Sequence, residues 1–127
     1  MNYNVIVVDD DDIILFLHHK ILQSVALSEG SKSFNSAKKF LDYIASLKED
    51  KRTILLFLDV NMPVMDGWGL LDIIHDEAFT HPIEIVMVTS SVDQEDKDKA
   101  AQYSKIINFV EKPFSKTILA SLNIDFD

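Results

Sequence analysis

Acidic, hydroxyl and amino side chains follow four short apolar runs of this chain, a placement that could support chemistry. One such group at the end of a strand means little, because strand ends need polar residues in any case. Four groups in one chain are harder to dismiss, because strands of one parallel sheet end at a shared edge. In chain order the groups are Asp9 with Asp10, Asp59, Thr89 with Ser90, and Lys112.

The chemistry that suits these residue types is phosphoryl transfer. Clustered carboxylates suit a hard divalent cation such as Mg²⁺, which prefers oxygen ligands. A hydroxyl and an ammonium bind anionic oxygens, and phosphoryl transfer is catalysed mainly by positioning and charge neutralisation. A carboxylate can also be the nucleophile and become an aspartyl phosphate. Of the four successive aspartates 9–12, Asp11 or Asp12 is expected to cap a helix.

The elements that must position these groups follow from hydrophobic periodicity. Short apolar runs predict buried strands of a parallel sheet, and apolar residues at a spacing of 3.6 predict helices. Regular alternation of the two predicts an α/β fold with helices on both faces of the sheet. Strands are predicted at 5–8, within 28–34, at 55–58, 83–88 and 106–110, and helices at 13–25, 36–47, 67–79, 92–102 and 115–122.

The first predicted helix contains two adjacent histidines, His18 and His19. Adjacent helical residues point in different directions, so the two do not form a metal-binding pair. Both are expected to be partly exposed polar positions.

Gly69 lies in the first turn of the third predicted helix, where glycine costs about 1 kcal/mol relative to alanine, and the sequence offers no reason for it. The apolar stripe of the first helix is predicted to comprise Ile14, Leu17, Ile21 and Val25.

Composition and charge exclude several classes of protein. The 127 residues are enough for one domain with a real core. Without cysteine, the chain has neither disulfides nor a thiolate metal site. A net charge of −9 argues against direct binding of nucleic acid, which needs a basic face. The apolar runs are too short for membrane insertion. A cytoplasmic location is therefore expected.

The motifs together resemble the receiver domain of two-component response regulators. They are Val-Val-Asp-Asp at 7–10, Leu-Asp-Val-Asn-Met-Pro-Val-Met-Asp-Gly at 58–67, Val-Thr-Ser at 88–90 and Glu-Lys-Pro-Phe at 111–114. The resemblance covers nearly the whole chain. It implies a flavodoxin-like, doubly wound α/β fold whose five-stranded parallel sheet has the order 2-1-3-4-5. It also implies that residues 1–127 form a single receiver domain, similar to chemotaxis regulators, without an effector domain.

The resemblance assigns a phosphoacceptor and a metal site. By analogy with the family, Asp59 accepts the phosphoryl group. Asp9 and Asp10 form an acidic pocket that binds Mg²⁺ together with Asp59, and the backbone carbonyl of Asn61 is a further metal ligand.

The resemblance also assigns a switch. Thr89 is expected to contact the phosphoryl group and to couple it to a conformational change that involves Phe109, the switch aromatic. Lys112 is expected to pair with the phosphoryl oxygens. A cis peptide bond is predicted at Lys112–Pro113, where the family commonly has one.

The implied function is that of a stand-alone receiver. A sensor histidine kinase or a histidine phosphotransfer protein would donate the phosphoryl group, and a downstream protein target would read the conformational change. The domain would catalyse only its own phosphorylation and dephosphorylation, and so would not be an enzyme in the usual sense.

Three alternatives remain open. A receiver-shaped interaction module could work without phosphorylation. A phosphatase of the haloacid-dehalogenase type also uses an aspartate nucleophile, but it has a second aspartate two residues later, where this chain has Asn61. A flavin-binding flavodoxin-like protein would need a phosphate-binding loop at the position of the acidic residues 9–12.

Overall fold

The computed structural model describes residues 3–25, 31–90 and 92–125, and it contains one five-stranded parallel sheet. The strand order is β2-β1-β3-β4-β5, which confirms the predicted flavodoxin-like topology. The strands are β1 (Tyr3–Val8), β2 (Lys32–Phe34), β3 (Thr53–Asp59), β4 (Ile83–Thr89) and β5 (Ile106–Glu111). The helices are α1 (Asp12–Val25), α2 (Ala37–Ser46), α3 (Gly67–Ile74), α4 (Gln94–Ala100) and α5 (Lys116–Ser121).

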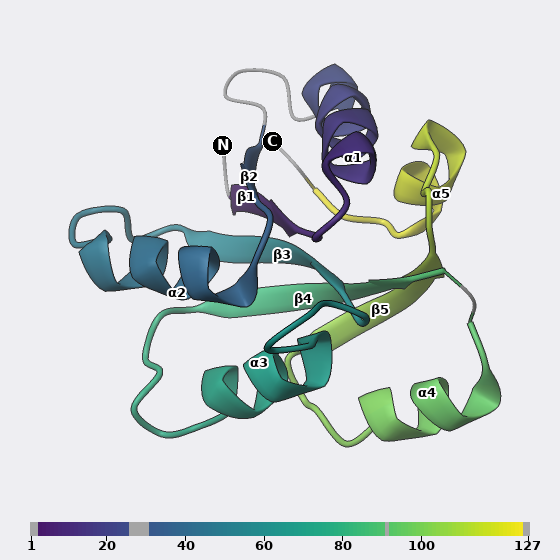
Figure 1. The fold of residues 1–127 in the computed structure, drawn as a ribbon. Helices are drawn as coiled ribbons and strands as arrows, with labels where there is room; N and C mark the ends of the chain where they lie inside the picture. Colours follow the sequence, from purple (N-terminus) through teal and green to yellow (C-terminus); the bar gives the residue numbers. More distant parts are fainter. Residues whose placement is uncertain (1–2, 26–30, 91, 126–127) are drawn as a thin grey trace.

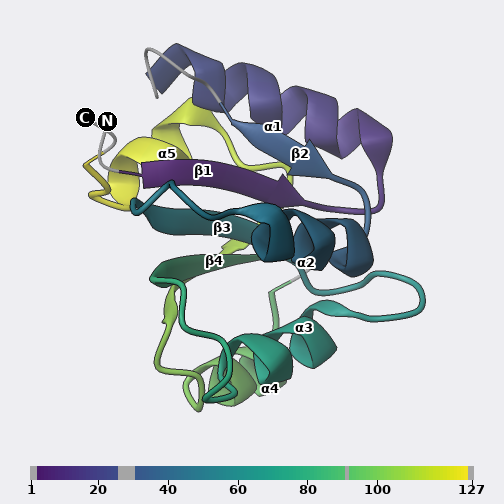
Figure 2. The same cartoon turned by 90° about the vertical axis from the view of Figure 1, so that its left-hand side faces the viewer.

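Helices cover both faces of the sheet, as Figures 1 and 2 show. Helices α1 and α5 lie on one face, and α2, α3 and α4 lie on the other. Alternate residues of β3 therefore face two separate cores: Leu56 packs on the α2–α4 side and Phe57 on the α1–α5 side. Burial on both faces explains why the central strands are almost continuously apolar in the sequence.

The register of the parallel strands brings their carboxyl ends to one edge of the sheet. Val8 of β1 lies beside Leu58 of β3, and Asp59 lies beside Val88 of β4. Thr89 in turn lies beside Glu111 of β5. The polar groups that follow β1, β3, β4 and β5 are therefore neighbours in space although they are far apart in the sequence.

The buried face of α1 differs from the predicted stripe. The buried residues are Leu15, His18 and Leu22, whereas Leu17 is 41% exposed. Residues 13–17 are all apolar, so the periodicity fits two frames that differ by one position. The expectation of a partly exposed His18 was wrong, because this frame places His18 in the core. His19 is half-buried, with its Nδ1 2.9 Å from Ser31 Oγ.

Helices α3 and α4 depart most from the predicted bounds, and in each a polar side chain sets one boundary. Helix α3 ends at Ile74 rather than at Phe79, since Asp76 accepts a hydrogen bond from the Ala78 amide and starts a turn. Helix α4 begins at Gln94 because the carboxylate of Asp93 caps it. Of the predicted strand within 28–34, β2 comprises the last three residues, and residues 28–30 lie outside the described part of the chain.

No helix within the described ranges is long and apolar enough to cross a membrane.

The junction between β3 and α3 requires glycine at position 67. A Cβ atom there would lie 2.6 Å from the carbonyl oxygen of Asp59 and 3.0 Å from Val60 Cα, both of them backbone atoms. The Gly67 amide also donates to the carbonyl oxygen of Val60 at 2.9 Å. A Cβ at Gly69 would meet the flexible Met65 side chain, at 3.2 Å. Close packing of α3 on the strand end therefore depends on Gly67.

These two glycines form a matched pair for a stability measurement. Gly67→Ala should lower the free energy of unfolding by about 1–3 kcal/mol, because the backbone on both sides must shift. Gly69→Ala should change it little or raise it by up to about 1 kcal/mol, because alanine is the better helix former. Urea unfolding of both variants measures the difference. Equal destabilisation by the two substitutions would contradict the proposed role of Gly67.

Candidate functional site

Three carboxylates meet at the carboxyl edge of the sheet. Asp9 and Asp10 follow β1, and Asp59 is the last residue of β3. One carboxylate oxygen from each lies within 4.8 Å of the other two. Asp9 and Asp59 are each 1% exposed, whereas Asp10 is exposed. The predicted acidic residues are thus brought together, with two of the three in the protein interior.

The ammonium group of Lys112 bridges the two buried carboxylates. Its Nζ lies 3.0 Å from Asp9 Oδ2 and 3.2 Å from Asp59 Oδ1. The lysine follows β5, and its backbone amide donates to the carbonyl oxygen of Thr89 at 2.7 Å. The Lys112–Pro113 peptide bond is cis. The ends of β4 and β5 together therefore hold the lysine over the acidic cluster.

One oxygen of Asp59 remains without a partner. Oδ1 accepts hydrogen bonds from the Asn61 amide, at 3.3 Å, and from Lys112. Oδ2 is buried and has no hydrogen-bond partner among the described residues. Asp9 differs, since its Oδ1 accepts from the Asp11 amide at 2.9 Å and its Oδ2 from Lys112. A buried carboxylate oxygen without a partner is costly unless a cation or a donor approaches it.

The electrostatics of the cluster raise the pKa of Asp59. Burial raises this pKa most, and the neighbouring Asp9 raises it further, from 3.8 to about 7, although Lys112 acts in the opposite direction. Burial by itself would lower the pKa of Lys112, but hydrogen bonds and charge attraction from Asp9 and Asp59 outweigh it and raise that pKa. Lys112 therefore stays charged, and further positive charge beside Asp59 would favour the ionised form of this carboxyl group.

The donor set fits a hard divalent cation. All three side chains offer carboxylate oxygens, which Mg²⁺ prefers, and the exposed Asp10 leaves room for water ligands. Three ionised carboxylates beside one ammonium leave two negative charges, which a divalent cation balances. The Oδ2 atom of Asp59, which accepts no hydrogen bond from the described residues, offers such a cation a free ligand.

The remaining predicted residues lie around this cluster. Thr89 is 2% exposed at the end of β4. Asn61 is exposed, and its backbone N–H donates a hydrogen bond to Asp59 Oδ1. Phe109 lies on β5 beside Met87 and is half-buried. It lines a pocket of about 470 Å³ between β5 and the helices α4 and α5, together with Val92, Lys97, Asn108, Val110, Glu111, Ile118, Ser121 and Leu122.

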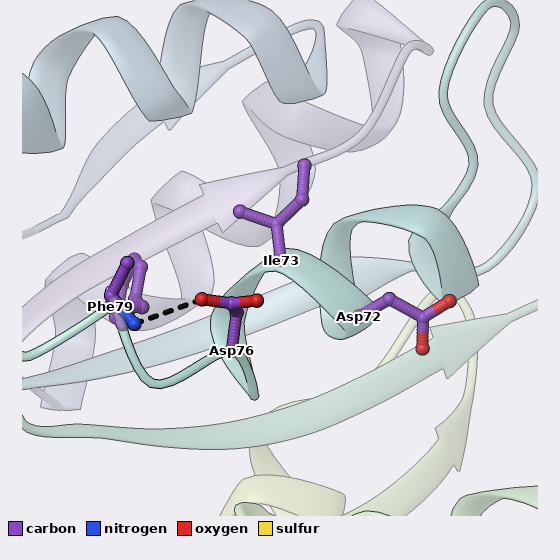
Figure 3. A pocket seen from close by; sticks show the side chains of 5 residues that line it. Asp72, Ile73, Asp76 and Phe79 are labelled. Carbon is purple, nitrogen blue, oxygen red and sulfur yellow. Dashed lines mark hydrogen bonds between the residues drawn. The ribbon is translucent and has the colours of Figure 1, made fainter.

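A second pocket lies at the C-terminal end of α3, whereas the loop that follows Asp59 leads into the N-terminal end of this helix. Its volume is about 370 Å³, and Figure 3 shows Ile73 and Phe79 with the carboxylates of Asp72 and Asp76 at its wall. The turn at residues 76–79, which ends α3, forms part of this wall. It holds none of the predicted site residues.

Two residues beside the site were not anticipated from the sequence. The contact between Gly67 and the carbonyl group of Asp59 depends on the angle at which α3 meets β3, which the sequence does not express. His18 contacts Phe114, which directly follows Lys112 and Pro113, and His18 and Phe114 are 96 positions apart in the sequence. The one available signal was that His18 shares a helical face with Leu15 and Leu22, which predicts burial.

Comparisons with known proteins agree with this geometry. The family model described as "Response regulator receiver domain" matches residues 5–122. The two-component response regulator ARR22 of Arabidopsis thaliana is 30% identical over 114 residues, which cover 89% of this chain and 75% of that protein.

Solved structures of receiver proteins are similar over nearly their whole length. A two-component response regulator from Cytophaga hutchinsonii is 28% identical with a TM-score of 0.79, covering 94% of this chain and 92% of the other. A response regulator receiver protein from Dyadobacter fermentans DSM 18053 is 29% identical with a TM-score of 0.79, covering 94% of both chains. The sequence motifs, the strand order and these matches together show that the chain belongs to the response regulator receiver domain family.

Proposed function

We propose that this receiver domain takes a phosphoryl group from a phosphohistidine onto Asp59, with Mg²⁺ bound, and signals by a change of conformation in the cytoplasm. The observation that carries the proposal is the environment of Asp59. One of its oxygens is bound by an ammonium group, and the other is buried beside two more carboxylates, with no hydrogen-bond partner in the described part of the chain. This arrangement suits a nucleophile whose reaction needs added positive charge.

The transfer follows from the positions of these groups. A carboxylate oxygen of Asp59 forms a bond to phosphorus while the bond between phosphorus and the donor's imidazole nitrogen breaks. The bonding electrons return to the imidazole, which then takes a proton. Lys112 neutralises charge on the phosphoryl oxygens and favours the ionised form of Asp59. Mg²⁺ held by Asp9, Asp10, Asp59 and the backbone carbonyl of Asn61 would add positive charge at the same oxygens.

The proposed switch joins the site to β5. The hydroxyl of Thr89 is the group that would bind a phosphoryl oxygen, and the carbonyl oxygen of the same residue holds the Lys112 amide. A shift of Thr89 toward the phosphoryl group would therefore also displace the backbone at the end of β5, through this hydrogen bond. Phe109 occupies a half-buried position on that strand, next to a pocket, and could turn inward. A downstream protein would read this change.

The outer face of α1 offers a surface for the phosphodonor. Ile13 is 72% exposed and Phe16 is 60% exposed, in the turns that follow the acidic residues. Exposed apolar side chains gathered on one face commonly mark a protein contact. A sensor histidine kinase or histidine phosphotransfer protein that covers these side chains would bring its phosphohistidine close to Asp59.

Binding of Mg²⁺ and beryllofluoride, a stable mimic of the phosphoryl group, tests the proposed site. We expect saturable binding of Mg²⁺, followed by beryllofluoride that binds only with the metal, in NMR titrations. Asp10→Asn should weaken Mg²⁺ binding by about tenfold or more, because a metal ligand loses its charge.

Asp12→Asn is the matched control, since it changes net charge equally in the exposed first turn of α1. Its Mg²⁺ affinity should stay within about twofold of the unmodified protein. Equal weakening by the two substitutions would mean that the cation is held by diffuse charge. Absence of beryllofluoride binding at saturating Mg²⁺ would favour a receiver-shaped module that works without phosphorylation.

A further inference from the structure

His18 is a buried polar residue that the proposed transfer does not use. It is 0% exposed in the middle of α1, on the same face as Leu15 and Leu22. An apolar side chain would fill this position without the cost of burying an imidazole. What the imidazole supplies is a hydrogen-bond acceptor, because its Nε2 receives the backbone N–H of Phe114 at 3.2 Å.

The contact with Phe114 uses the face of the ring as well as its nitrogen. The ring of His18 is stacked on that of Phe114, with centroids 3.7 Å apart and an interplanar angle of 17°. Phe114 also packs on Phe57, at 5.0 Å, two residues before Asp59 in β3. Helix α1 therefore fixes both the backbone and the side chain of Phe114 relative to the strand that carries the phosphoacceptor.

The segment that carries Lys112 is held at two points. On one side the Lys112 amide donates to the carbonyl oxygen of Thr89. Pro113 has no amide hydrogen, so the next backbone donor is Phe114, and it is bound by His18. The ammonium group that bridges Asp9 and Asp59 thus extends from a short segment anchored by β4 before the proline and by α1 after it.

This hydrogen bond requires one form of the imidazole. Nε2 must carry a lone pair in order to accept, so the proton of the neutral ring lies on Nδ1. Burial, reinforced by the positive charge of Lys112, lowers the pKa of His18 from 6.5 to about 4. The neutral ring, which this hydrogen bond requires, is therefore the form present at neutral pH.

We propose that His18 is a positioning residue for phosphoryl transfer, which fixes the Lys112 ammonium group over Asp59 through the backbone of Phe114. The proposal rests on the function proposed for Asp59. It differs from a simple packing role because it depends on the acceptor nitrogen as well as on the volume of the ring.

Two substitutions separate the acceptor from the ring. His18→Phe keeps an aromatic ring that can stack on Phe114 but removes the acceptor. His18→Gln loses the ring, but its side-chain carbonyl oxygen can take about the position of Nε2. His18→Phe should slow phosphorylation of Asp59 by acetyl phosphate about fivefold to tenfold, as expected for one lost hydrogen bond, whereas His18→Gln should remain within about threefold.

A double-mutant cycle tests whether the effect passes through Lys112. His18→Phe should weaken beryllofluoride binding in the unmodified protein but not in a Lys112→Ala background. If the rate and the affinity are the same in His18→Phe as in the unmodified protein, the proposal is overturned. It is also overturned if His18→Gln loses as much activity as His18→Phe, or if the losses add fully in the double variant.

Two NMR readouts do not depend on phosphorylation. The Phe114 amide should exchange slowly, and the Lys112 ammonium should give a sharp ¹⁵N-correlated signal, in the unmodified protein and in His18→Gln. Both properties should be lost in His18→Phe. If the unmodified protein binds neither acetyl phosphate nor beryllofluoride, the proposed function fails, and these readouts still decide whether His18 positions the lysine. An unchanged ammonium signal in His18→Phe would contradict the positioning role.

Discussion

Asp59→Asn should abolish acceptance of a phosphoryl group and, at the same time, make the metal-free protein more stable at neutral and alkaline pH. The loss of transfer follows because an amide is not a nucleophile toward phosphorus, and Asp59 is the proposed phosphoacceptor of the two buried carboxylates that Lys112 bridges. The gain in stability follows because the buried carboxylate is held beside Asp9, and one of its oxygens accepts no hydrogen bond from the residues that the structure describes. Opposite changes in activity and stability exclude unfolding as the cause of the loss.

The pH dependence of this stability has a definite sign. Burial and Asp9 raise the pKa of Asp59 from 3.8 to about 7, so the folded protein binds a proton that the unfolded chain releases. This proton contributes its full stability below pH 3.8, the ordinary pKa of the unfolded chain. The contribution is lost as the pH rises to about 7, the pKa in the folded protein. Between about pH 5.5 and pH 8, the unmodified protein should lose about 2 kcal/mol relative to Asp59→Asn.

Chemical denaturation of both proteins across this pH range, without Mg²⁺, measures the difference. Saturating Mg²⁺ should reduce this difference in the free energy of unfolding between the two proteins, because the cation stabilises the ionised carboxylate. A constant difference from acid to alkaline pH would mean that Asp59 titrates normally, which would remove the electrostatic argument for its role.

Lys112→Ala should slow phosphoryl transfer by about 10²–10³-fold, a loss typical of removing one preorganised charge from the transition state. The same substitution should tighten Mg²⁺ binding, because it removes a cation that lies 3.0 Å from Asp9 and 3.2 Å from Asp59. It should also lower the stability of the metal-free protein by about 3–5 kcal/mol at pH 8, since two buried carboxylates lose their partner.

Lys116→Ala is a suitable control for charge, because Lys116 is an exposed lysine four residues further along the chain. It should leave the transfer rate and Mg²⁺ affinity nearly unchanged. The two readouts of Lys112→Ala are expected to move in opposite directions, with slower transfer and tighter metal binding. Weaker Mg²⁺ binding in a variant that still folds would contradict the arrangement of charges described here.

The parts of the fold that follow from the sequence are those that depend on continuous burial. The central strands are buried on both faces, and so 55–58 and 85–88 are apolar throughout and are followed by polar residues. Alternation with helices then fixes a parallel sheet, and a parallel sheet brings Asp9, Asp59 and Lys112 to one edge.

The features that were not predicted correctly depend on contacts between residues far apart in the sequence, or on competition between local interactions. The buried face of α1 was misplaced because five successive apolar residues allow two frames, and contact with Phe114 favours the one with His18 inside. The end of α3 was misplaced because a turn at Asp76 replaces a further helical turn. Pairing of Lys112 with Asp9 as well as with Asp59 requires the strand register, which residue types alone do not give.

Phosphorylation of Asp59 is tested most directly by the intact mass of the protein after incubation with acetyl phosphate and Mg²⁺, followed by peptide mapping of the modified residue. We expect one phosphoryl group per chain, carried by Asp59, absent after removal of Mg²⁺ with EDTA and absent in Asp59→Asn. A phosphoryl group on another residue, or an equal yield without Mg²⁺, would contradict it.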